Sequence, residues 1–187
     1  MPLFFLNMST NKPVEVNTIL GELISLPDKK WLVIRTKSRH EKKVADYAFN
    51  ANIHYYLPLQ DSEKIYQNRK IVFTKPLFSG YIFAHCDFKE KQTLVISGHV
   101  AHFLHVINEQ ELLDELRSIY FGNQREAVFR ETEYLESGTR VQIVAGKLAG
   151  LTGYVKDQSN LSEVVLQVNL LHQAVAVTVN PSHVKII

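Results

Sequence analysis

The sequence lacks several features that would point directly to a function. It contains one cysteine, Cys86, so no internal disulfide can form, and a free thiol suits a reducing compartment. The formal net charge is only +2 at pH 7, which is too small by itself to predict a nucleic-acid-binding protein. The apolar start, Met1–Leu6, is too short for a membrane span and carries no basic leader of a signal peptide. We therefore expect a cytoplasmic protein that does not contact the membrane.

Motifs for metal binding and catalysis are equally scarce. His99, His102 and His105 recur every third residue, a spacing that sends successive side chains to opposite faces of a strand. A structural zinc site would also need four nitrogen or sulfur ligands, and Cys86 is the only thiol. No hydrolase motif surrounds Cys86, and no glycine-rich loop precedes a helix as it does in phosphate-binding sites. We expect no enzyme, no metal and no cofactor.

Residues 30–120 alternate between strand-like and helix-like patterns. Ser38 and Glu41 form a predicted capping box at one helix start, and Asn108 with Glu111 marks another. The apolar faces of these two helices are Val44, Tyr47, Ala48 and Ala51, and Leu112, Leu113, Leu116, Ile119 and Tyr120. Strands are expected at 31–36, 53–57, 71–73, 77–86 and 102–106, a short helix at 93–96, and a polar hairpin tip at 61–69. The order strand, helix, strand, strand, helix, strand is that of a ferredoxin-like α+β domain, an antiparallel sheet flanked by helices.

The end of the chain has a different composition. Residues 164–170 and 174–179 are rich in β-branched side chains and flank His172-Gln173, a pattern typical of a hairpin. Gly146, Gly150 and Gly153 lie between further strand-like runs, where tight turns need positive φ or a close backbone approach. A segment of this size with several short strands suits a small SH3-like β-barrel.

These patterns divide the chain into four parts. We expect an N-terminal extension at 1–29, an α+β domain at 30–120, a charged linker at 121–134 and the small barrel at 135–187. The sequence leaves open whether the extension packs on the domain or forms a separate tail.

Two motifs together resemble a known family. The aromatic strand segment Leu77-Phe-Ser-Gly-Tyr81 is followed, further along the chain, by the glycines 146, 150 and 153 in the pattern of a KOW motif. In this order they resemble the NusG-like transcription elongation and antitermination factors. The resemblance implies a non-enzymatic, monomeric factor whose NusG N-terminal domain binds RNA polymerase and suppresses pausing or termination. Housekeeping members carry Phe-Pro-Gly-Tyr where this chain has Phe-Ser-Gly-Tyr, so the chain is more similar to specialised RfaH-like or UpxY-like paralogues that serve particular long operons.

The resemblance also implies binding residues. The clamp helices of the largest polymerase subunit would contact a hydrophobic depression formed by Tyr56, Leu57, Pro58, Phe78 and Tyr81. From the residues alone, about half of the aromatic side chains in this region are expected in the core, and a contiguous exposed remainder would mark an interface. Residues 89–93 correspond to a polar, threonine-rich loop that contacts the gate loop of the β subunit, and only Thr93 matches that pattern.

A basic segment that leads into the first helix has two interpretations. It is either a solvated helix face or, by the resemblance, a contact for the non-template DNA strand through Lys37, Arg39, His40 and Lys43. The KOW domain would recruit a second partner, such as a ribosomal small-subunit protein or Rho. The main alternative for the whole chain is a KOW-type RNA-binding module of a ribosome-linked or RNA-processing protein. The few basic residues of 135–187 favour protein docking over RNA.

Overall fold

The computed structural model describes residues 15–67 and 69–187, and the first part of the expected N-terminal extension lies outside them. The first half of the chain forms a five-stranded antiparallel sheet in the order β1-β3-β6-β2-β7. Its elements, with a separate hairpin of β4 and β5, are β1 (Ile19–Leu20), β2 (Lys30–Thr36), α1 (Glu41–Asn50), β3 (His54–Tyr56), β4 (Leu59–Tyr66), β5 (Arg69–Pro76), β6 (Tyr81–Cys86), α2 (Phe88–Ile96), β7 (Val100–Leu104) and α3 (Glu109–Gln124). The expected α+β class is confirmed.

Of the two predicted helix caps, the one before α1 is wrong and the one before α3 is confirmed. The capping box at Ser38 is wrong: α1 begins at Glu41, His40 is its N-cap, and no side chain caps it. The carboxylate of Glu41 instead accepts a hydrogen bond from the Gly80 backbone amide. At α3 the prediction is confirmed, because the Asn108 side chain accepts from the Glu111 amide.

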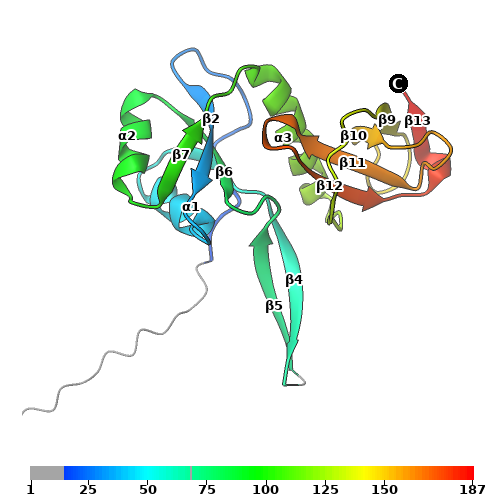
Figure 1. The fold of residues 1–187 in the computed structure, drawn as a ribbon, viewed down its shortest axis with the longest axis horizontal. Coiled ribbons are helices and arrows are strands. Elements are labelled where there is room, and N and C mark those ends of the chain that lie inside the picture. Colours follow the sequence, from blue (N-terminus) through cyan, green and yellow to red (C-terminus); the bar gives the residue numbers. More distant parts are fainter. Residues whose placement is uncertain (1–14, 68) are drawn as a thin grey trace, which may run out of the picture.

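Two other elements differ from the prediction in their boundaries. Helix α2 starts at Phe88 rather than 93, because Asp87 and Glu90 form a reciprocal capping box that the sequence reading missed. The expected hairpin tip at 61–69 is mostly strand, since β4 and β5 pair along eight positions and extend away from the body of the protein (Figure 1). Its polar sequence reflects a ribbon whose two faces are both accessible to solvent.

The described part of the N-terminal segment packs against the domain. Strand β1 pairs with β3 at the edge of the sheet, and the Leu57 amide donates to the Thr18 carbonyl. Leu23 is buried in the core, the Trp31 indole donates to the Ile24 carbonyl, and Arg117 of α3 donates to the Leu23 carbonyl. The segment therefore links the sheet edge to α3.

We expect Leu23→Ala to lower the free energy of unfolding by about 2–3 kcal/mol, since it removes buried methyl groups and leaves a cavity. Ile24→Ala is the matched control, because Ile24 is 40% exposed and its loss should cost well under ~1 kcal/mol. Urea denaturation of both variants measures the difference. Equal, small losses would show that this segment does not belong to the cooperative core.

The second half of the chain forms a six-stranded antiparallel sheet in the order β13-β9-β10-β11-β12-β8. Its elements are β8 (Arg130–Thr132), β9 (Thr139–Ile143), β10 (Thr152–Val155), β11 (Glu163–Val168), η1 (Asn169–Leu171), β12 (Gln173–Thr178), η2 (Pro181–His183) and β13 (Val184–Ile186). The predicted hairpin at 164–179 is confirmed. The expected barrel is not closed, because the edge strands β8 and β13 do not pair with each other within the described part of the chain.

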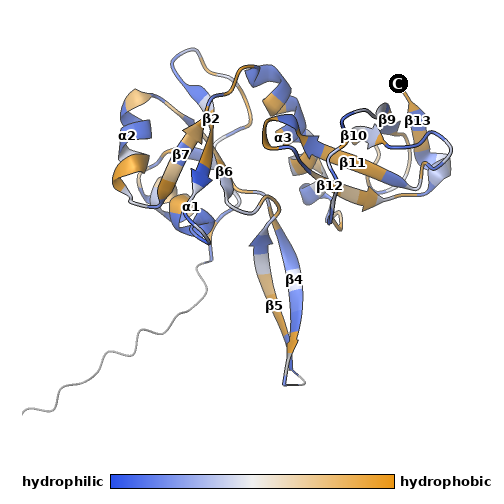
Figure 2. Ribbon diagram, in the orientation of Figure 1, coloured by the Kyte–Doolittle hydropathy of each residue, from blue (hydrophilic) through white to orange (hydrophobic). Residues whose placement is uncertain are grey.

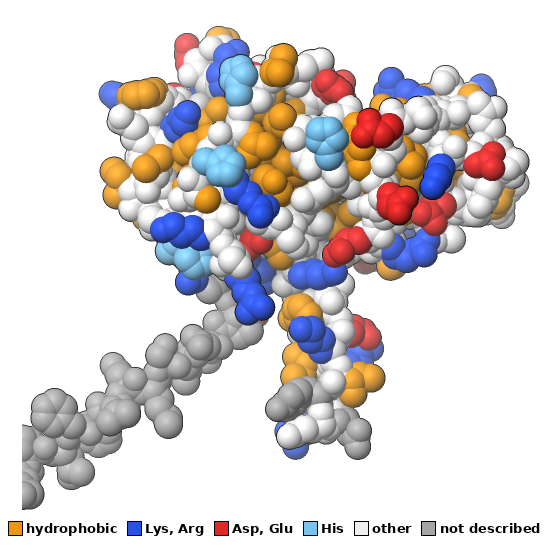
Figure 3. Space-filling view, in the orientation of Figure 1, with side chains coloured by type: hydrophobic (Ala, Val, Ile, Leu, Met, Phe, Trp, Pro, Cys, Tyr) orange, Lys and Arg blue, Asp and Glu red, His pale blue; other side chains and the backbone are white. Residues whose placement is uncertain are grey.

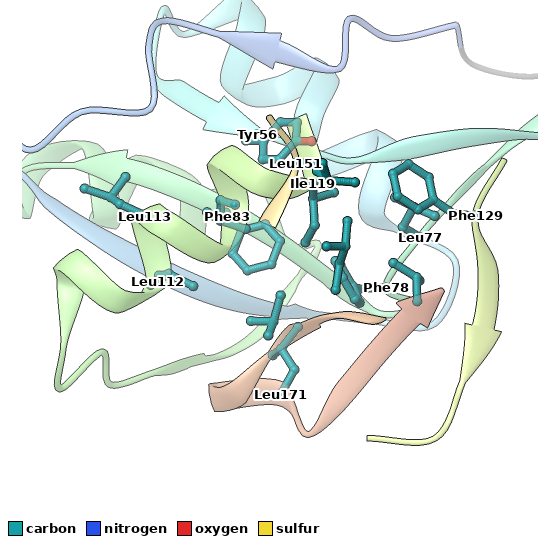
Figure 4. Close-up of a cluster of buried hydrophobic side chains, with 14 of the residues drawn as sticks. Tyr56, Leu77, Phe78, Phe83, Leu112, Leu113, Ile119, Phe129, Leu151 and Leu171 are labelled. Carbon is teal, nitrogen blue, oxygen red and sulfur yellow. The ribbon is translucent and has the colours of Figure 1, made fainter. Parts of the chain in front are cut away.

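Helix α3 lies between the two sheets, as Figure 1 shows. It continues to Gln124, and β8 joins the second sheet, so the segment expected as a linker contains the helix end and a strand. One hydrophobic cluster, with side chains from both halves, continues around the helix (Figure 4). It includes Phe83, Leu116 and Leu171, whereas a second cluster lies under α1 and α2. None of the helices in the described ranges is long and apolar enough to cross a membrane.

Candidate functional site

The loop from Leu77 to Tyr81 is held in place by two charged side chains. Glu41, itself buried, accepts a hydrogen bond of 2.5 Å from the Gly80 amide. Arg35 donates to the Ser79 carbonyl at 3.2 Å, and its guanidinium lies 4.6 Å from the centre of the Tyr81 ring. Gly80 has φ of 85°, and an added Cβ would lie 2.3 Å from an Arg35 nitrogen. Gly80 therefore allows both the positive φ of this loop and the close approach of the Arg35 side chain.

The structure brings together only some of the five predicted polymerase-binding residues. Tyr56, Phe78 and Tyr81 lie on the side of the sheet that faces α3, and the Phe78 ring contacts Phe83 edge-on at 6.2 Å. Leu57 packs in the opposite core, under α1. Pro58 is buried, and its carbonyl accepts from the Leu77 amide. These five residues are therefore not one continuous surface.

Most of the five predicted polymerase-binding residues are buried. Tyr56 and Leu57 are completely buried, Phe78 is 1% exposed, and Tyr81 alone is partly exposed. The Tyr56 ring stands edge-on to Tyr120 of α3 at 5.8 Å, and burial raises the pKa of its hydroxyl, which stays protonated.

The cover is supplied by α3 and by the second sheet. The Asn169 amide donates to Glu115 at 3.1 Å, and its side chain donates to Glu111 at 2.5 Å. A small pocket between the halves is lined by Phe78 on one side and by His172 and neighbouring β12 residues on the other. Figure 4 shows Leu171 and Phe78 in the same apolar cluster. In this arrangement the second half of the chain closes off the Phe78 side of the sheet.

The basic segment before α1 contacts His99, a residue that the sequence analysis did not connect with it. Arg39 has a left-handed backbone, with φ of 60°, and Lys43 lies 3.3 Å from the His40 ring nitrogen Nε2. Lys37 donates to the Gly98 carbonyl at 2.6 Å. The His99 ring stands edge-on to His40 at 4.8 Å.

His99 reaches this position because β7 pairs with β2, a long-range contact that residue spacing does not reveal. Burial lowers the pKa of His99, and the neighbouring charges of His40, Lys43 and Lys37 lower it further. A neutral imidazole ring thus lies next to three basic side chains. That is a combination suited to phosphate contact with base stacking.

Comparison with known protein families gives a match to the first half of the chain. Residues 29–117 match the family model described as NusG, transcription termination factor nusG. That range contains all strands of the first sheet except β1, together with α1, α2, the first part of α3 and the Leu77–Tyr81 loop. Over these residues, just under half of its length, the chain is similar to NusG. No curated protein sequence matches it.

Two solved structures are similar to the NusG-like chain. A structure of Thermotoga maritima NusG that concerns its domain interaction shares 20% identity with this chain, the match covers 85% of this chain and 97% of that one, and the TM-score is 0.46. The MjSpt4:Spt5 complex in conformation B shares 20% identity, covers 84% of this chain and 96% of its own, and has a TM-score of 0.28.

The glycines of the predicted KOW turn have separate roles in the NusG-like chain. Gly146 and Gly150 adopt φ of 81° and 98°, and a Cβ on Gly150 would lie 3.2 Å from the Phe121 ring of α3. Gly153 lies in β10, where a Cβ would lie 2.6 Å from both Val164 and the Val165 carbonyl. Two glycines therefore allow turns and the third allows close strand packing.

Two remaining candidates have ordinary structural roles. Residues 89–93, expected as a polar loop, lie within α2, where the Thr93 hydroxyl donates to the Lys89 carbonyl. Cys86 is buried, and burial raises the pKa of its thiol to about 12. A thiol that stays protonated is a poor nucleophile.

Proposed function

We propose that this chain is a transcription elongation factor that binds RNA polymerase through its N-terminal domain. The match of residues 29–117 to the NusG family carries the proposal. The clamp helices of the largest subunit would contact the Leu77–Tyr81 loop, with Phe78 and Tyr81 as the aromatic anchors. Large aromatic side chains on a well-supported loop are typical of binding hot spots.

The proposed mechanism is a shift between polymerase states. A factor can favour an elongating, closed clamp only if it binds that state more tightly than the open, paused state. Reduced pausing and resistance to termination would follow. The Phe-Ser-Gly-Tyr sequence supports a specialised factor that acts on particular long operons.

Binding would require movement of the second half of the chain. Phe78 is 1% exposed, and β12 residues line the pocket beside it. The clamp helices and the C-terminal sheet would therefore compete for one apolar surface. Release of this sheet would also free it to recruit its own partner, such as Rho or a ribosomal small-subunit protein.

The non-template DNA strand is the proposed ligand of Lys37, Arg39, His40 and Lys43. The support is the position of His40, Lys43 and Lys37 beside the His99 ring, with Arg39 next to them in the sequence. In this arrangement Lys37, Arg39 and Lys43 would contact phosphates, and the imidazole rings would stack on an unpaired base.

The proposal predicts that Tyr81→Ala strongly weakens the effect on pausing. Hot-spot aromatics contribute ~2 kcal/mol or more, so at least about tenfold more protein should be needed to shorten a pause. The measurement is pause lifetime in a reconstituted transcription reaction with the full chain. Phe49→Ala is the control, because Phe49 is a 45% exposed aromatic residue on α1, away from this loop. If the wild-type chain binds RNA but leaves pause lifetime unchanged, the RNA-binding alternative replaces this proposal.

A further inference from the structure

Residues 19–25, which we call the strap, lie against the first sheet and the start of α3. At one end β1 pairs with β3, and at the other the Ser25 hydroxyl donates to Glu109 of α3 at 3.0 Å. Between these ends Leu23 is buried, and its carbonyl accepts from the Arg117 side chain at 2.9 Å. The strap is thus held by a few contacts, of which only Leu23 contributes a buried side chain.

Under the strap, three ring side chains form a row across the sheet. His54 of β3, His85 of β6 and Trp31 of β2 are cross-strand neighbours. The His85 ring stacks on Trp31 with centres 5.0 Å apart, and the centre of the His54 ring lies 6.4 Å away. The Trp31 indole donates to the Ile24 carbonyl at 2.8 Å, and a Cβ on Gly21 would lie 2.5 Å from the His54 ring. Because it contacts both outer rings, the strap passes over the middle one.

His85, the middle ring, is buried in a place that does not suit a charge. It is 0% exposed, and neither ring nitrogen has a hydrogen-bond partner among the described residues. The next row on this face is Val33 and Phe83, and Figure 2 shows hydrophobic residues along the middle of β2. Other histidine side chains lie at the surface, as Figure 3 shows. A buried imidazole without partners is stable only in its neutral form.

The charged groups around His85 do not compensate for its burial. Burial lowers its pKa below the ordinary value of 6.5, and the charges of His54 and Lys29 lower it further. Glu109 and the Lys29 backbone raise the pKa, but the Glu109 carboxylate already lies 3.7 Å from the Lys30 ammonium. The closed strap therefore covers a ring that resists protonation.

We propose that the strap is a latch that opens when His85 takes up a proton. Opening lets water reach the ring, so the open state binds the proton that the closed state excludes. Because the closed state has the lower pKa, the stability that neutral His85 gives the latch is fully present above pH 6.5 and is lost as pH falls below that value. Acid would thus uncover Leu23 and Trp31. The inference goes beyond the proposed function, because it concerns the free protein and requires no polymerase.

The test is hydrogen exchange of the Trp31 indole N–H in the full chain, followed by NMR. Trp31 is the only tryptophan, and its N–H bonds the strap directly. Relative to free indole at the same pH, its protection should be about tenfold lower at pH ~5.5 than at pH ~7.5, since one proton is bound on opening. It should also stay below the protection of the Ile34 amide in the centre of the sheet, because the latch opens without the core.

Substitutions of histidine separate the latch from general effects of acid. His85→Phe keeps a ring on Trp31 but cannot take up a proton, so the Trp31 protection should be equal at the two pH values. His85→Gln, which is also neutral, serves if the phenylalanine variant does not fold. His102 is exposed on β7, and His102→Gln should keep the full pH dependence.

A pair of glycine variants tests the cover itself. Gly21 has φ of 87°, and its Cβ would meet the His54 ring, so Gly21→Ala should lower the Trp31 protection at least about tenfold even at pH ~7.5. Gly98 has a similar φ of 72°, with nothing within 4 Å of an added Cβ. Gly98→Ala should therefore leave the Trp31 protection unchanged.

Three results would overturn the proposal. One is a Trp31 protection that does not depend on pH in the wild-type chain. The second is a pH dependence that persists in a folded His85 variant. The third is equal protection of the Trp31 indole and the Ile34 amide at both pH values, which would mean that the strap opens only when the whole domain unfolds. None of these results depends on whether the chain acts on polymerase.

Discussion

A negative charge at Leu171 is expected to release the C-terminal half and expose the Phe78 side of the sheet. Leu171 is 8% exposed and lies in the apolar cluster that joins the two halves (Figure 4). Leu171→Asp would place an unpaired carboxylate in that cluster, which costs several kcal/mol unless the halves separate and hydrate it. Undocking is therefore the lower-energy response.

If the proposed function holds, the expected consequence is a gain in affinity for polymerase. When only a fraction of molecules is open, the apparent dissociation constant is the intrinsic one divided by that fraction. Each ~1.4 kcal/mol that favours the docked state thus weakens binding about tenfold. We expect Leu171→Asp to bind a clamp-helix peptide at least about tenfold more tightly than the wild-type chain.

The control for this prediction adds the same charge where no contact is lost. Val128 is 81% exposed between α3 and β8, so Val128→Asp should leave peptide affinity unchanged. Isothermal titration with each folded full-length variant provides the affinities. If Leu171→Asp keeps its fold and binds no better than wild type, the docked half does not compete with the clamp helices.

The second prediction concerns the way in which Glu115 makes the stability of the protein depend on pH. Burial between α3 and η1 raises the pKa of Glu115 from its ordinary value of 4.5 to about 7. The Asn169 amide lowers the pKa and opposes this shift, and the nearby Glu111 and Asp114 carboxylates add to it. Because the folded state favours the protonated acid, the stability associated with Glu115 is fully present below pH 4.5 and is lost as pH rises through about 7.

Glu115→Gln should remove this pH dependence. Glutamine stays neutral and its oxygen can still accept from the Asn169 amide, so the variant should match wild type in acid and exceed it at alkaline pH. One pKa unit corresponds to about 1.4 kcal/mol, and solvent near the partly buried carboxylate reduces the full effect. We expect the difference in free energy of unfolding to widen by about 1–2 kcal/mol between roughly pH 5 and pH 8.

A matched variant on the same helix isolates the effect of burial. Glu111 is exposed and also contacts Asn169, so Glu111→Gln should leave most of the pH dependence in place, less only the small part that the Glu111 charge adds to the raised pKa of Glu115. Urea denaturation of the three proteins across this pH range gives the comparison. A constant difference between Glu115→Gln and wild type would show that Glu115 ionises normally in the folded protein.

The sequence predicts a helix start correctly where the capping side chain bonds an amide a few residues away. Asn108 caps α3 as expected because its side chain reaches an amide only three residues away. The capping box at Ser38 was wrong because a distant group, the Gly80 amide, takes the Glu41 carboxylate. The sequence contains the Asp87–Glu90 box at α2, so that start could have been predicted.

Long-range packing explains the features of the site that the sequence did not predict. His99 meets His40 only because β7 pairs with β2, a contact that the spacing of His99, His102 and His105 could not reveal. Aromatic residues such as Tyr56 and Phe78 were expected to be partly exposed, yet α3 and the C-terminal sheet bury them. Composition identifies apolar side chains but cannot tell which half of a chain covers them. The binding role of the candidate residues stays a prediction from the sequence, and only the structure shows how far each is accessible.

The central claim is that the Phe78 side of the sheet binds polymerase once the C-terminal half has left it. The most direct test is titration of a clamp-helix peptide into full-length Leu171→Asp protein, with and without Phe78→Ala. We predict that Leu171→Asp binds tightly and that adding Phe78→Ala removes most of that affinity while the N-terminal domain stays folded. Equal binding by the two proteins, or no binding by either, would contradict the claim.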